Sequence, residues 1–220
     1  MTTGNTTPSN PPATHLIAAL AADNGSMRLR AALAIGSNPE PALVDTLVER
    51  CAIEPDFYVR DMLTWALIQF PPAITLPKLL AELRSERAQA RSQALHTLSK
   101  IKDASAWPAI TQSLLRDADD EVARSAWRAA VILAPAEQHK ELAEELATQL
   151  GRGHRDMQLS LSLALVTLGE EAVAPILHKA MANEDPVIKA HANATERLLR
   201  DPDAGFQLAI DHIKLIFAPG

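Results

Sequence analysis

The hydrophobic and polar positions of this chain recur with a period of about 32 residues. Two segments, DFYVRDMLTWA from Asp56 and DEVARSAWRAA from Asp120, share an Asp-x-x-x-Arg opening followed by apolar residues at helical spacing. We use the fifth residue of this opening as an anchor; the anchor positions hold Arg28, Arg60, Arg91, Arg124, Met157 and Lys189. The gaps between them are 32, 31, 33, 33 and 32 residues, which indicates an internal repeat.

Each repeat is predicted to be a pair of helices joined by a tight turn. Four residues before the anchors stand Asn24, Asp56, Arg87, Asp120, Gly153 and Asp185. Four of these six are good helix N-cap residues, so each anchor is predicted to lie one turn inside a helix. A further apolar segment precedes each of these helices, as in PALVDTLVERCAI and KELAEELATQL. The chain is therefore predicted to form six helix pairs.

The repeats are predicted to form one domain over residues 14–217. The repeats are placed at about 14–38, 41–70, 74–102, 104–134, 137–169 and 170–200. Residues 1–13 form a polar Thr, Asn and Pro segment that is typical of a disordered tail. Residues 203–217 carry apolar residues at helical spacing and are predicted to be a helix that caps the last repeat; an amphipathic helix that awaits a partner is the alternative.

Composition supports an all-α protein. The chain has 220 residues, of which 47% are hydrophobic, 4% are aromatic and eight are glycine, which suits helices better than a β-sandwich. A net charge of -6 argues against a dedicated nucleic-acid binder. The first residues lack the pattern of a signal peptide, and no apolar run is long enough for a bilayer. We expect a cytoplasmic protein without a membrane partner.

The period and layout resemble the HEAT-repeat family, in particular the short bacterial repeats of the phycobilisome-lyase-like type. The best units are SMRLRAALAIG, DFYVRDMLTWAL, RAQARSQALHTLSKI and DEVARSAWRAAVIL, and the resemblance covers about residues 14 to 200. It implies a right-handed α-solenoid, or superhelix, in which an inner row of helices lines a concave surface. It specifies architecture strongly and activity weakly.

The acidic caps and basic anchors are predicted to form a structural ladder. Because a two-helix unit must stack to bury its apolar face, the caps of successive repeats line up, and carboxylates come near guanidinium groups. Charge-assisted hydrogen bonds between them would then fix the stacking. The predicted ladder consists of Asp56, Arg60, Asp120, Arg124, Asp185 and Lys189.

Patterns typical of catalysis are missing from the sequence. It has no glycine-rich phosphate loop, no Gly-x-Ser-x-Gly elbow and no His-x-x-x-His pair. HEAT-repeat deoxyhypusine hydroxylases hold iron with His-Glu motifs, which this chain lacks. Cys51, the single cysteine, is read as a buried inert thiol. We therefore predict no catalytic residues, no cofactor and no metal, and hence no enzyme.

One face of the second helices is the candidate binding surface. Residues one, four and five positions past an anchor are neighbours on a helix. In the middle repeats these positions hold an aromatic residue, an arginine and polar residues, a composition that binding hot spots favour. The predicted partner-binding residues are Asp61, Thr64, Trp65, Ser92, His96 and Arg128. The alternative for Trp65 is a core position between repeats, because Trp107 and Trp127 also occupy positions typical of core.

These patterns favour a non-catalytic adaptor or regulatory scaffold that holds a protein partner of unknown identity. Residues 74–102 contain six basic and two acidic side chains, a basic island that could meet an acidic protein surface or a nucleic-acid backbone; a solvated helix face is the simpler reading. The alternative function is DNA binding similar to the HEAT-like DNA-alkylation-repair glycosylases. A bilin-lyase-like activity is implied by the name of the repeat type, without support from a cysteine or aromatic cluster.

Overall fold

The computed structural model describes residues 12–201, and within this range every regular element is helical. The all-α prediction is therefore confirmed. The predicted capping helix 203–217 lies outside the described residues, as does the predicted polar tail except for its last two residues. The described chain divides into two compact units, with the boundary between Ala109 and Ile110. We describe each unit by itself.

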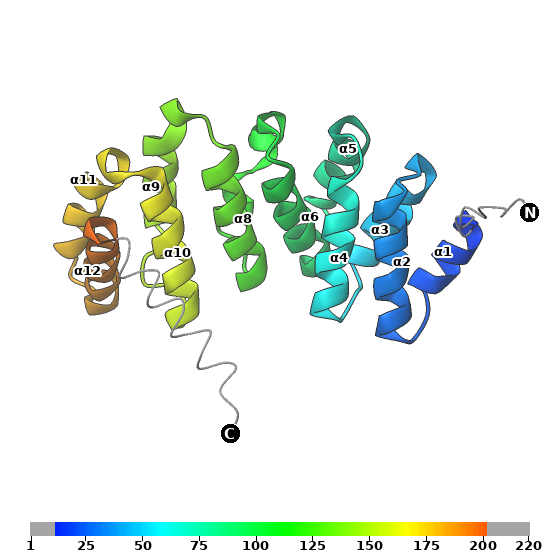
Figure 1. Ribbon diagram of the computed structural model, residues 1–220. Helices are drawn as coiled ribbons and strands as arrows, with labels where there is room; N and C mark the ends of the chain where they lie inside the picture. The colour runs from blue at the N-terminus through cyan, green and yellow to red at the C-terminus, as the bar shows by residue number, and fades with distance from the viewer. Residues whose placement is uncertain (1–11, 202–220) are drawn as a thin grey trace, which may run out of the picture. The chain divides into compact units, whose positions relative to one another are not determined.

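The first unit contains three helix pairs (Figure 1). Its elements are α1 (Ala13–Leu20), α2 (Gly25–Ser37), the 3-10 helix η1 (Pro41–Leu43), α3 (Val44–Cys51), α4 (Phe57–Ile68), α5 (Pro72–Glu82), α6 (Ala88–Ile101) and the 3-10 helix η2 (Ala104–Ala109). The second helices of the pairs pack as a row, α2 on α4 and α4 on α6, while α3 packs on α5. This two-layer stacking buries Leu47, Leu63 and Leu95 completely.

The second unit repeats this arrangement. Its elements are α7 (Gln112–Leu115), α8 (Asp120–Leu133), the 3-10 helix η3 (Ala136–Gln138), α9 (His139–Ala147), α10 (Arg155–Leu168), α11 (Glu170–Met181) and α12 (Pro186–Arg200). Helix α10 packs between α8 and α12, and α9 packs on α11. Met157, which occupies an anchor position, is fully buried here with Leu161. Each unit thus contains three helix pairs. The total of six over the described residues is the number that the period predicted.

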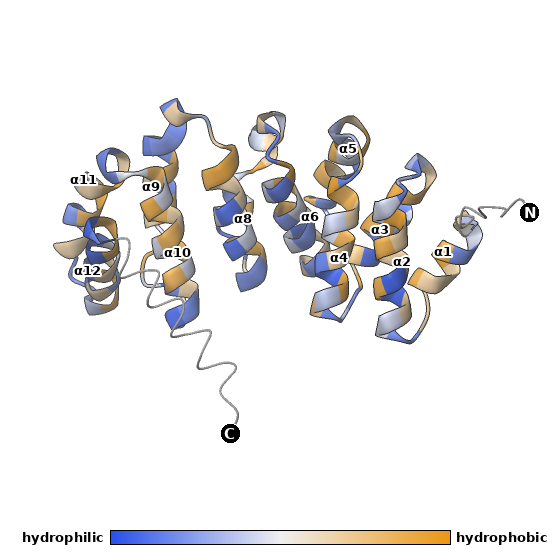
Figure 2. Cartoon of the chain, in the orientation of Figure 1, coloured by the Kyte–Doolittle hydropathy of each residue, from blue (hydrophilic) through white to orange (hydrophobic). Residues whose placement is uncertain are grey.

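Hydropathy follows this packing. In Figure 2 the helices carry both apolar and polar residues, so that each can turn an apolar side to a neighbour and a polar side to solvent. The fourth repeat departs from the predicted pair of helices, because no single α-helix forms in its first segment, AWPAITQSLLRDA. There the chain forms η2, which contains Pro108, followed by the four-residue helix α7. Proline removes a backbone donor and clashes with the preceding turn, which disfavours a continuous α-helix at Pro108.

The N-caps agree with the sequence pattern at three of the predicted places. The side chains of Asn24, Asp56 and Asp185 accept hydrogen bonds from backbone amides in the first turns of α2, α4 and α12. Helix α8 is capped by Asp119 rather than by the predicted Asp120. Helix α10 begins after His154 instead of Gly153, and Gly153 has a positive φ of 67° in the preceding turn. The pattern thus located the helix starts to within one residue.

The anchor arginines bind backbone carbonyls, which differs from the predicted carboxylate ladder. Arg60 Nη1 donates to the carbonyl oxygens of Glu54 and Pro55 at 2.9 and 2.8 Å. Arg28 and Arg91 make the same pair of bonds to the residues six and five positions earlier. In each repeat of the first unit, the anchor therefore fastens the turn between the two helices to the second helix. This explains its constant place in the repeat.

The ladder residues of the second unit also have partners other than those predicted. Arg124 donates to Glu121 and Ser160, and Asp120 pairs with Arg152 at 2.8 Å. Arg152 also donates to the carbonyl oxygen of Asp117. Lys189 is exposed near the start of α12. The turn before α8 is thus bound by Arg152 of the next repeat instead of by its own anchor. The spacing of Asp and Arg in the sequence did not indicate this exchange of partners.

A buried histidine ties three segments of the second unit together. The Gly151 amide donates to Nδ1 of His191 at 3.0 Å, and Nε2 lies 2.9 Å from the Gln158 carbonyl oxygen, to which it donates. Ser162 Oγ lies 3.1 Å from Nε2. Because an N–H group faces Nδ1, the neutral ring fits this site and the imidazolium does not. Burial lowers the pKa of His191, although the bond to Gln158 opposes the shift.

We expect the second unit to lose stability in mild acid through His191. The folded-state pKa lies below the usual value near 6.5, so below that pH the unfolded chain binds a proton that the folded chain excludes. The contribution of His191 is present above pH 6.5 and falls by up to about 1.4 kcal/mol per pH unit below it. Urea unfolding of the wild type and of His191→Gln between pH 7.5 and 5 measures the difference. The exposed His178→Gln is the control; parallel pH profiles for wild type and His191→Gln would contradict this role.

Candidate functional site

Helix α4 carries the candidate site on its exposed side. We define the α4 face as Phe57, Tyr58, Asp61, Trp65 and Ile68. Spacings of three and four residues place these side chains along one side of the helix. Phe57 and Tyr58 expose 65% and 69% of their surface, Asp61 and Ile68 are exposed, and Trp65 is half-buried. A solvent-facing stripe that contains three aromatic residues is unusual in a chain with 4% aromatics.

The two most exposed aromatic side chains of the described residues lie together at the start of α4. The rings of Phe57 and Tyr58 are 5.7 Å apart and nearly perpendicular, at 78°. The guanidinium carbon of Arg60 lies 5.9 Å from the centre of the Phe57 ring, within reach of a cation–π contact. These contacts restrain the rings but leave most of their surface in water, where it is available to a partner.

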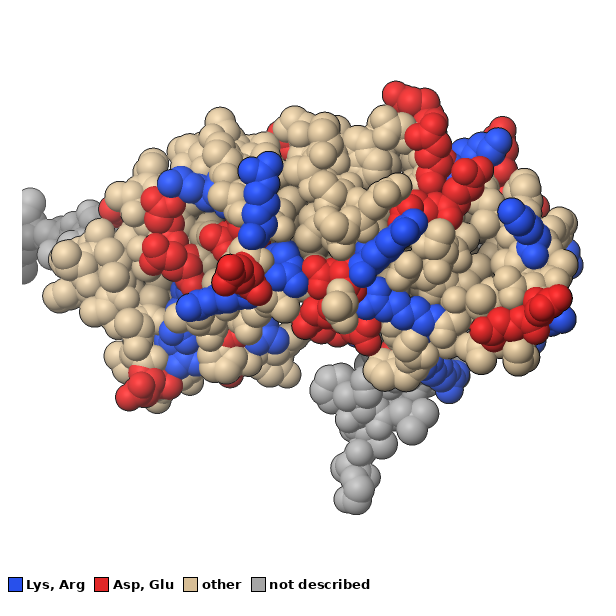
Figure 3. Space-filling model, turned by 180° about the vertical axis from the view of Figure 1, so that it is seen from behind, with Lys and Arg blue, Asp and Glu red and all other residues tan. Residues whose placement is uncertain are grey.

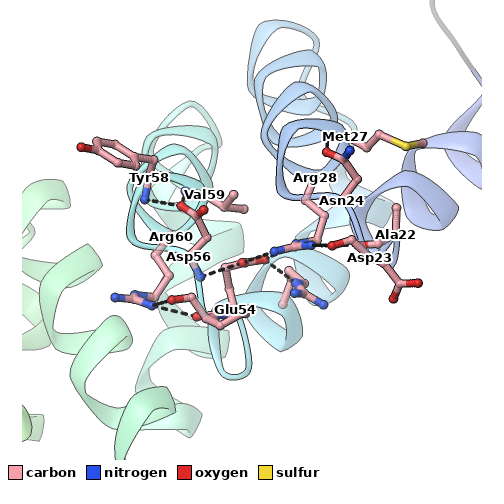
Figure 4. Close-up of polar contacts among 12 residues, drawn as sticks. Ala22, Asp23, Asn24, Met27, Arg28, Glu54, Asp56, Tyr58, Val59 and Arg60 are labelled. Atoms are coloured by element: carbon pink, nitrogen blue, oxygen red, sulfur yellow. Dashed lines mark hydrogen bonds and ion pairs between the residues drawn. The ribbon is translucent and has the colours of Figure 1, made fainter.

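A polar network beneath this pair fixes the start of α4 (Figure 4). The Asp56 carboxylate accepts hydrogen bonds from the amides of Tyr58 and Val59, which caps the helix and orients its first turn. Arg60 binds the Glu54 and Pro55 carbonyl oxygens from inside the helix. The backbone before and after Phe57 is therefore held at several points, and the aromatic pair is presented from a rigid turn.

Glu54 is the centre of this network. Its carboxylate has no exposed surface and receives two hydrogen bonds of 2.7 Å from Nε and Nη2 of Arg28. Nε of Arg50 donates a third at 2.7 Å and the Asp56 amide a fourth at 2.9 Å. Burial would raise the pKa of Glu54, but the bonds from Arg28, Asp56 and Arg50 outweigh it and hold the pKa at about 2. Helices α2, α3 and α4 are joined through one ionised carboxylate.

The Trp65 ring packs against α2 at Gly36, a position that has room only for glycine. A Cβ atom on Gly36 would come 2.3 Å from the Trp65 ring and 2.9 Å from Cα of Ala66, both closer than packed atoms can approach. The indole is therefore half-buried against α2 instead of standing free in solvent. It combines the two alternatives weighed from the sequence, because one part packs between repeats and another part is accessible.

Thr64 and Ser92 were predicted to bind a partner, and the structure buries both. Thr64 is 3% exposed and its hydroxyl lies 3.5 Å from that of Thr97 on α6. Ser92 is 7% exposed and donates to the Gln89 carbonyl oxygen. The second helices have neighbours on both sides in the row, so a larger part of their surface is covered than the face analysis assumed. These two residues are packing residues.

The other predicted partner-binding residues are divided between the two units. His96 is half-buried on α6, in the first unit. Arg128 is exposed on α8 and belongs to the second unit. In the first unit, the repeat places Leu33, Trp65 and His96 at the equivalent position five residues past the anchor, and Leu33 is 46% exposed. The accessible surface beside the α4 face is therefore apolar on α2 and carries an imidazole on α6.

Phe57 and Tyr58 were missed by the sequence analysis. It considered positions one, four and five past each anchor, whereas these residues stand three and two positions before it. The equivalent positions hold Gly25 and Ser26 in the first repeat and Ala88 and Gln89 in the third. A comparison of the repeats at these places would have shown that large aromatic residues occur there in the second repeat. This was the available signal.

Two features of the described residues bear on catalysis. They contain no group of three or more His, Cys, Asp and Glu side chains that could hold a metal ion. Cys51 is buried, and its pKa is raised to about 12 by burial and by the charge of Glu54, against the opposing effect of Arg60. A thiol with this pKa is not ionised near neutral pH and is a poor nucleophile. This agrees with the structural reading of Cys51.

Charged side chains do not form a single-sign surface in the view from behind. Figure 3 shows Lys and Arg interspersed with Asp and Glu on that side. Within the basic island, Lys78 pairs with Asp45 at 2.8 Å, and Arg91 binds backbone carbonyls. Part of the positive charge of the basic island is thus paired within the first unit.

Over residues 12–201, none of the helices is long and apolar enough to cross a membrane.

Comparison with known proteins supports the repeat. Residues 52–131, which contain the α4 face, match HEAT repeats. This chain contains HEAT repeats. Among solved structures it is similar to the complex of CpcE and CpcF of phycocyanin lyase from Nostoc sp. PCC7120, with 20% sequence identity and a TM-score of 0.48, over 90% of this chain and 82% of that chain. No curated protein sequence matches the chain. The match over residues 52–131 confirms the HEAT-repeat resemblance for that part of the chain.

Proposed function

We propose that the chain is a non-catalytic scaffold that binds a protein partner through the α4 face. The observation that supports this most is the exposure of 65% of Phe57 and 69% of Tyr58 on a rigid helix start. Keeping two large aromatic side chains in water costs free energy that burial in a complex would recover. Tyr and Trp are also enriched among residues that dominate binding energy.

The remaining residues of the face suit a protein rather than DNA. Asp61 stands between the aromatic pair and Trp65, and a carboxylate there would repel phosphates. Ile68 adds apolar surface that can pack against a partner's side chains, and Leu33 on the neighbouring helix α2 extends it. The expected partner presents an apolar segment with a basic or hydrogen-bond-donating group opposite Asp61. DNA binding similar to that of HEAT-like glycosylases is the weaker alternative.

Replacing Tyr58 by serine is expected to weaken the complex with the native partner by about 2 kcal/mol or more, or roughly 30-fold, the range of hot-spot residues. The tagged chain would first capture the partner from its own cells, and the purified pair would then be titrated by calorimetry. The unfolding free energy should change by less than about 0.5 kcal/mol, because Tyr58 is a surface residue.

Val187→Ser provides the matched control. Val187 is 49% exposed and occupies the same place before its anchor in the sixth repeat as Tyr58 does in the second. The Val187→Ser variant should bind the partner with the same affinity as the wild type. Equal affinities for wild type and Tyr58→Ser would refute the α4 face as the contact surface. Tight duplex-DNA binding that weakens steeply with salt would instead favour the alternative.

A further inference from the structure

The second unit has a depression of about 140 Å³ on its row of second helices. Arg124, Arg128 and Val131 line it from α8, and Ser160, Leu163 and Thr167 line it from α10. The two helices pack directly on each other, so both walls belong to one compact unit. A volume of this size exceeds that of a water molecule several times and admits a small polar group with a short stem.

The two arginines of this depression have different surroundings. Nη1 of Arg124 donates to Glu121 at 2.8 Å and its Nε to the Ser160 hydroxyl at 3.0 Å, which holds its side chain in place. Arg128, one turn later on α8, donates no hydrogen bond to any of residues 12–201. The pair carries two positive charges, and Glu121 on the same helix supplies the carboxylate paired with Arg124.

The guanidinium group of Arg128 is in an unfavourable environment. Burial and the charge of Arg124 lower the pKa of Arg128, while Glu121 opposes the shift. A guanidinium group stays ionised under such a shift, so Arg128, which is exposed as a whole residue, keeps its charge beside the like charge of Arg124. An oxyanion in the depression would relieve both effects through charge-assisted hydrogen bonds. The fork of a guanidinium matches the two oxygens of a carboxylate or phosphate.

We propose that the depression between α8 and α10 is a binding site for an oxyanion, a carboxylate or a phosphate group, with Arg128 as its principal donor and Arg124 as a second positive charge. The hydroxyl groups of Ser160 and Thr167 already donate to the carbonyl oxygens of Asp156 and Leu163, so their protons are not available to an anion. The hydrogen-bond donors for the oxyanion are therefore the two arginines. Leu163, which is 43% exposed, and Val131 offer an apolar wall for a short stem. This site lies in the second unit and does not depend on the proposed function of the α4 face.

The test is a titration of the full chain, ¹⁵N-labelled at arginine side chains and backbone, followed by NMR. The probes are inorganic phosphate, propionate and a short peptide with one glutamate, each at constant ionic strength with chloride as the balancing ion. We expect saturable shifts at Arg128 and in α8 and α10. Saturation by phosphate without propionate assigns a phosphate ligand, whereas saturation by propionate or the peptide assigns a carboxylate.

Variants separate this site from general anion binding. Arg128→Gln should weaken binding at least tenfold, and Arg124→Lys should weaken it less because the charge is kept. Arg84→Gln removes an exposed arginine of the first unit and should bind like the wild type. Arg128 is exposed, so its replacement should leave the fold intact, which thermal unfolding verifies. Linear, unsaturable shifts with every probe, or equal binding by Arg128→Gln, would overturn the proposal.

Discussion

Replacing Glu54 by alanine is expected to lower the free energy of unfolding by about 3 to 5 kcal/mol, the cost of breaking a buried ion pair from one side. The substitution removes the acceptor of four hydrogen bonds and leaves the buried guanidinium of Arg28 without its carboxylate. Arg50 and the Asp56 amide lose a partner at the same time. Urea unfolding followed by circular dichroism measures the change.

Glu49→Ala is the matched control, because Glu49 is an exposed glutamate on helix α3, just before the loop that carries Glu54. It should change stability by less than about 0.5 kcal/mol. Because the folded pKa of Glu54 is lowered to about 2 from 4.5, its contribution is complete above pH 4.5 and is lost as the pH falls towards 2. The wild type should therefore lose more stability than Glu54→Gln over this interval. A cost for Glu54→Ala similar to that of Glu49→Ala would show that the network is not a stabilising centre.

Replacing Trp127 by alanine is expected to cost the second unit about 3 to 5 kcal/mol. Trp127 is 1% exposed, and its indole nitrogen donates to the Leu115 carbonyl oxygen at 2.8 Å, which joins α8 to the short helix α7. Truncation would leave a cavity between the two helices and a buried carbonyl oxygen without its donor. Chemical unfolding followed by circular dichroism measures the loss.

Trp127→Phe distinguishes packing from the hydrogen bond. It keeps most of the ring and removes the donor, so it should cost about 1 to 3 kcal/mol, less than alanine. Trp65→Ala is a useful comparison, since its indole is half-buried and it should cost less stability than Trp127→Ala. Equal losses at Trp65 and Trp127 would mean that Trp65 is a core residue and would weaken its assignment to the α4 face.

The sequence by itself determined the all-α class, the six helix pairs and the HEAT repeats, because these depend on local periodicity. An N-cap such as Asp56 acts on amides two and three residues away, and an anchor such as Arg60 acts on carbonyls five and six residues away. Interactions of this range recur with each repeat and leave a regular trace in the sequence. The anchors were therefore found correctly, although in the first unit their shared acceptors are backbone carbonyls, and the carboxylates that Arg28 and Arg124 bind belong to Glu54 and Glu121, outside the predicted ladder.

Tertiary structure decided which residues of each repeat are accessible and which partners the charges take. Thr64 on α4 and Ser92 on α6 belong to the positions that were predicted to bind a partner, yet the packing of α4 against α6 buries them. Glu54 lies in a loop, and its importance comes from Arg28, 26 residues earlier, which folding brings within 2.7 Å. The depression at Arg128 likewise needs Leu163 and Ser160 from another helix. Such contacts depend on which helices become neighbours and at what distance. A repeat pattern in the sequence does not specify which side chain of a neighbouring repeat lies opposite each position.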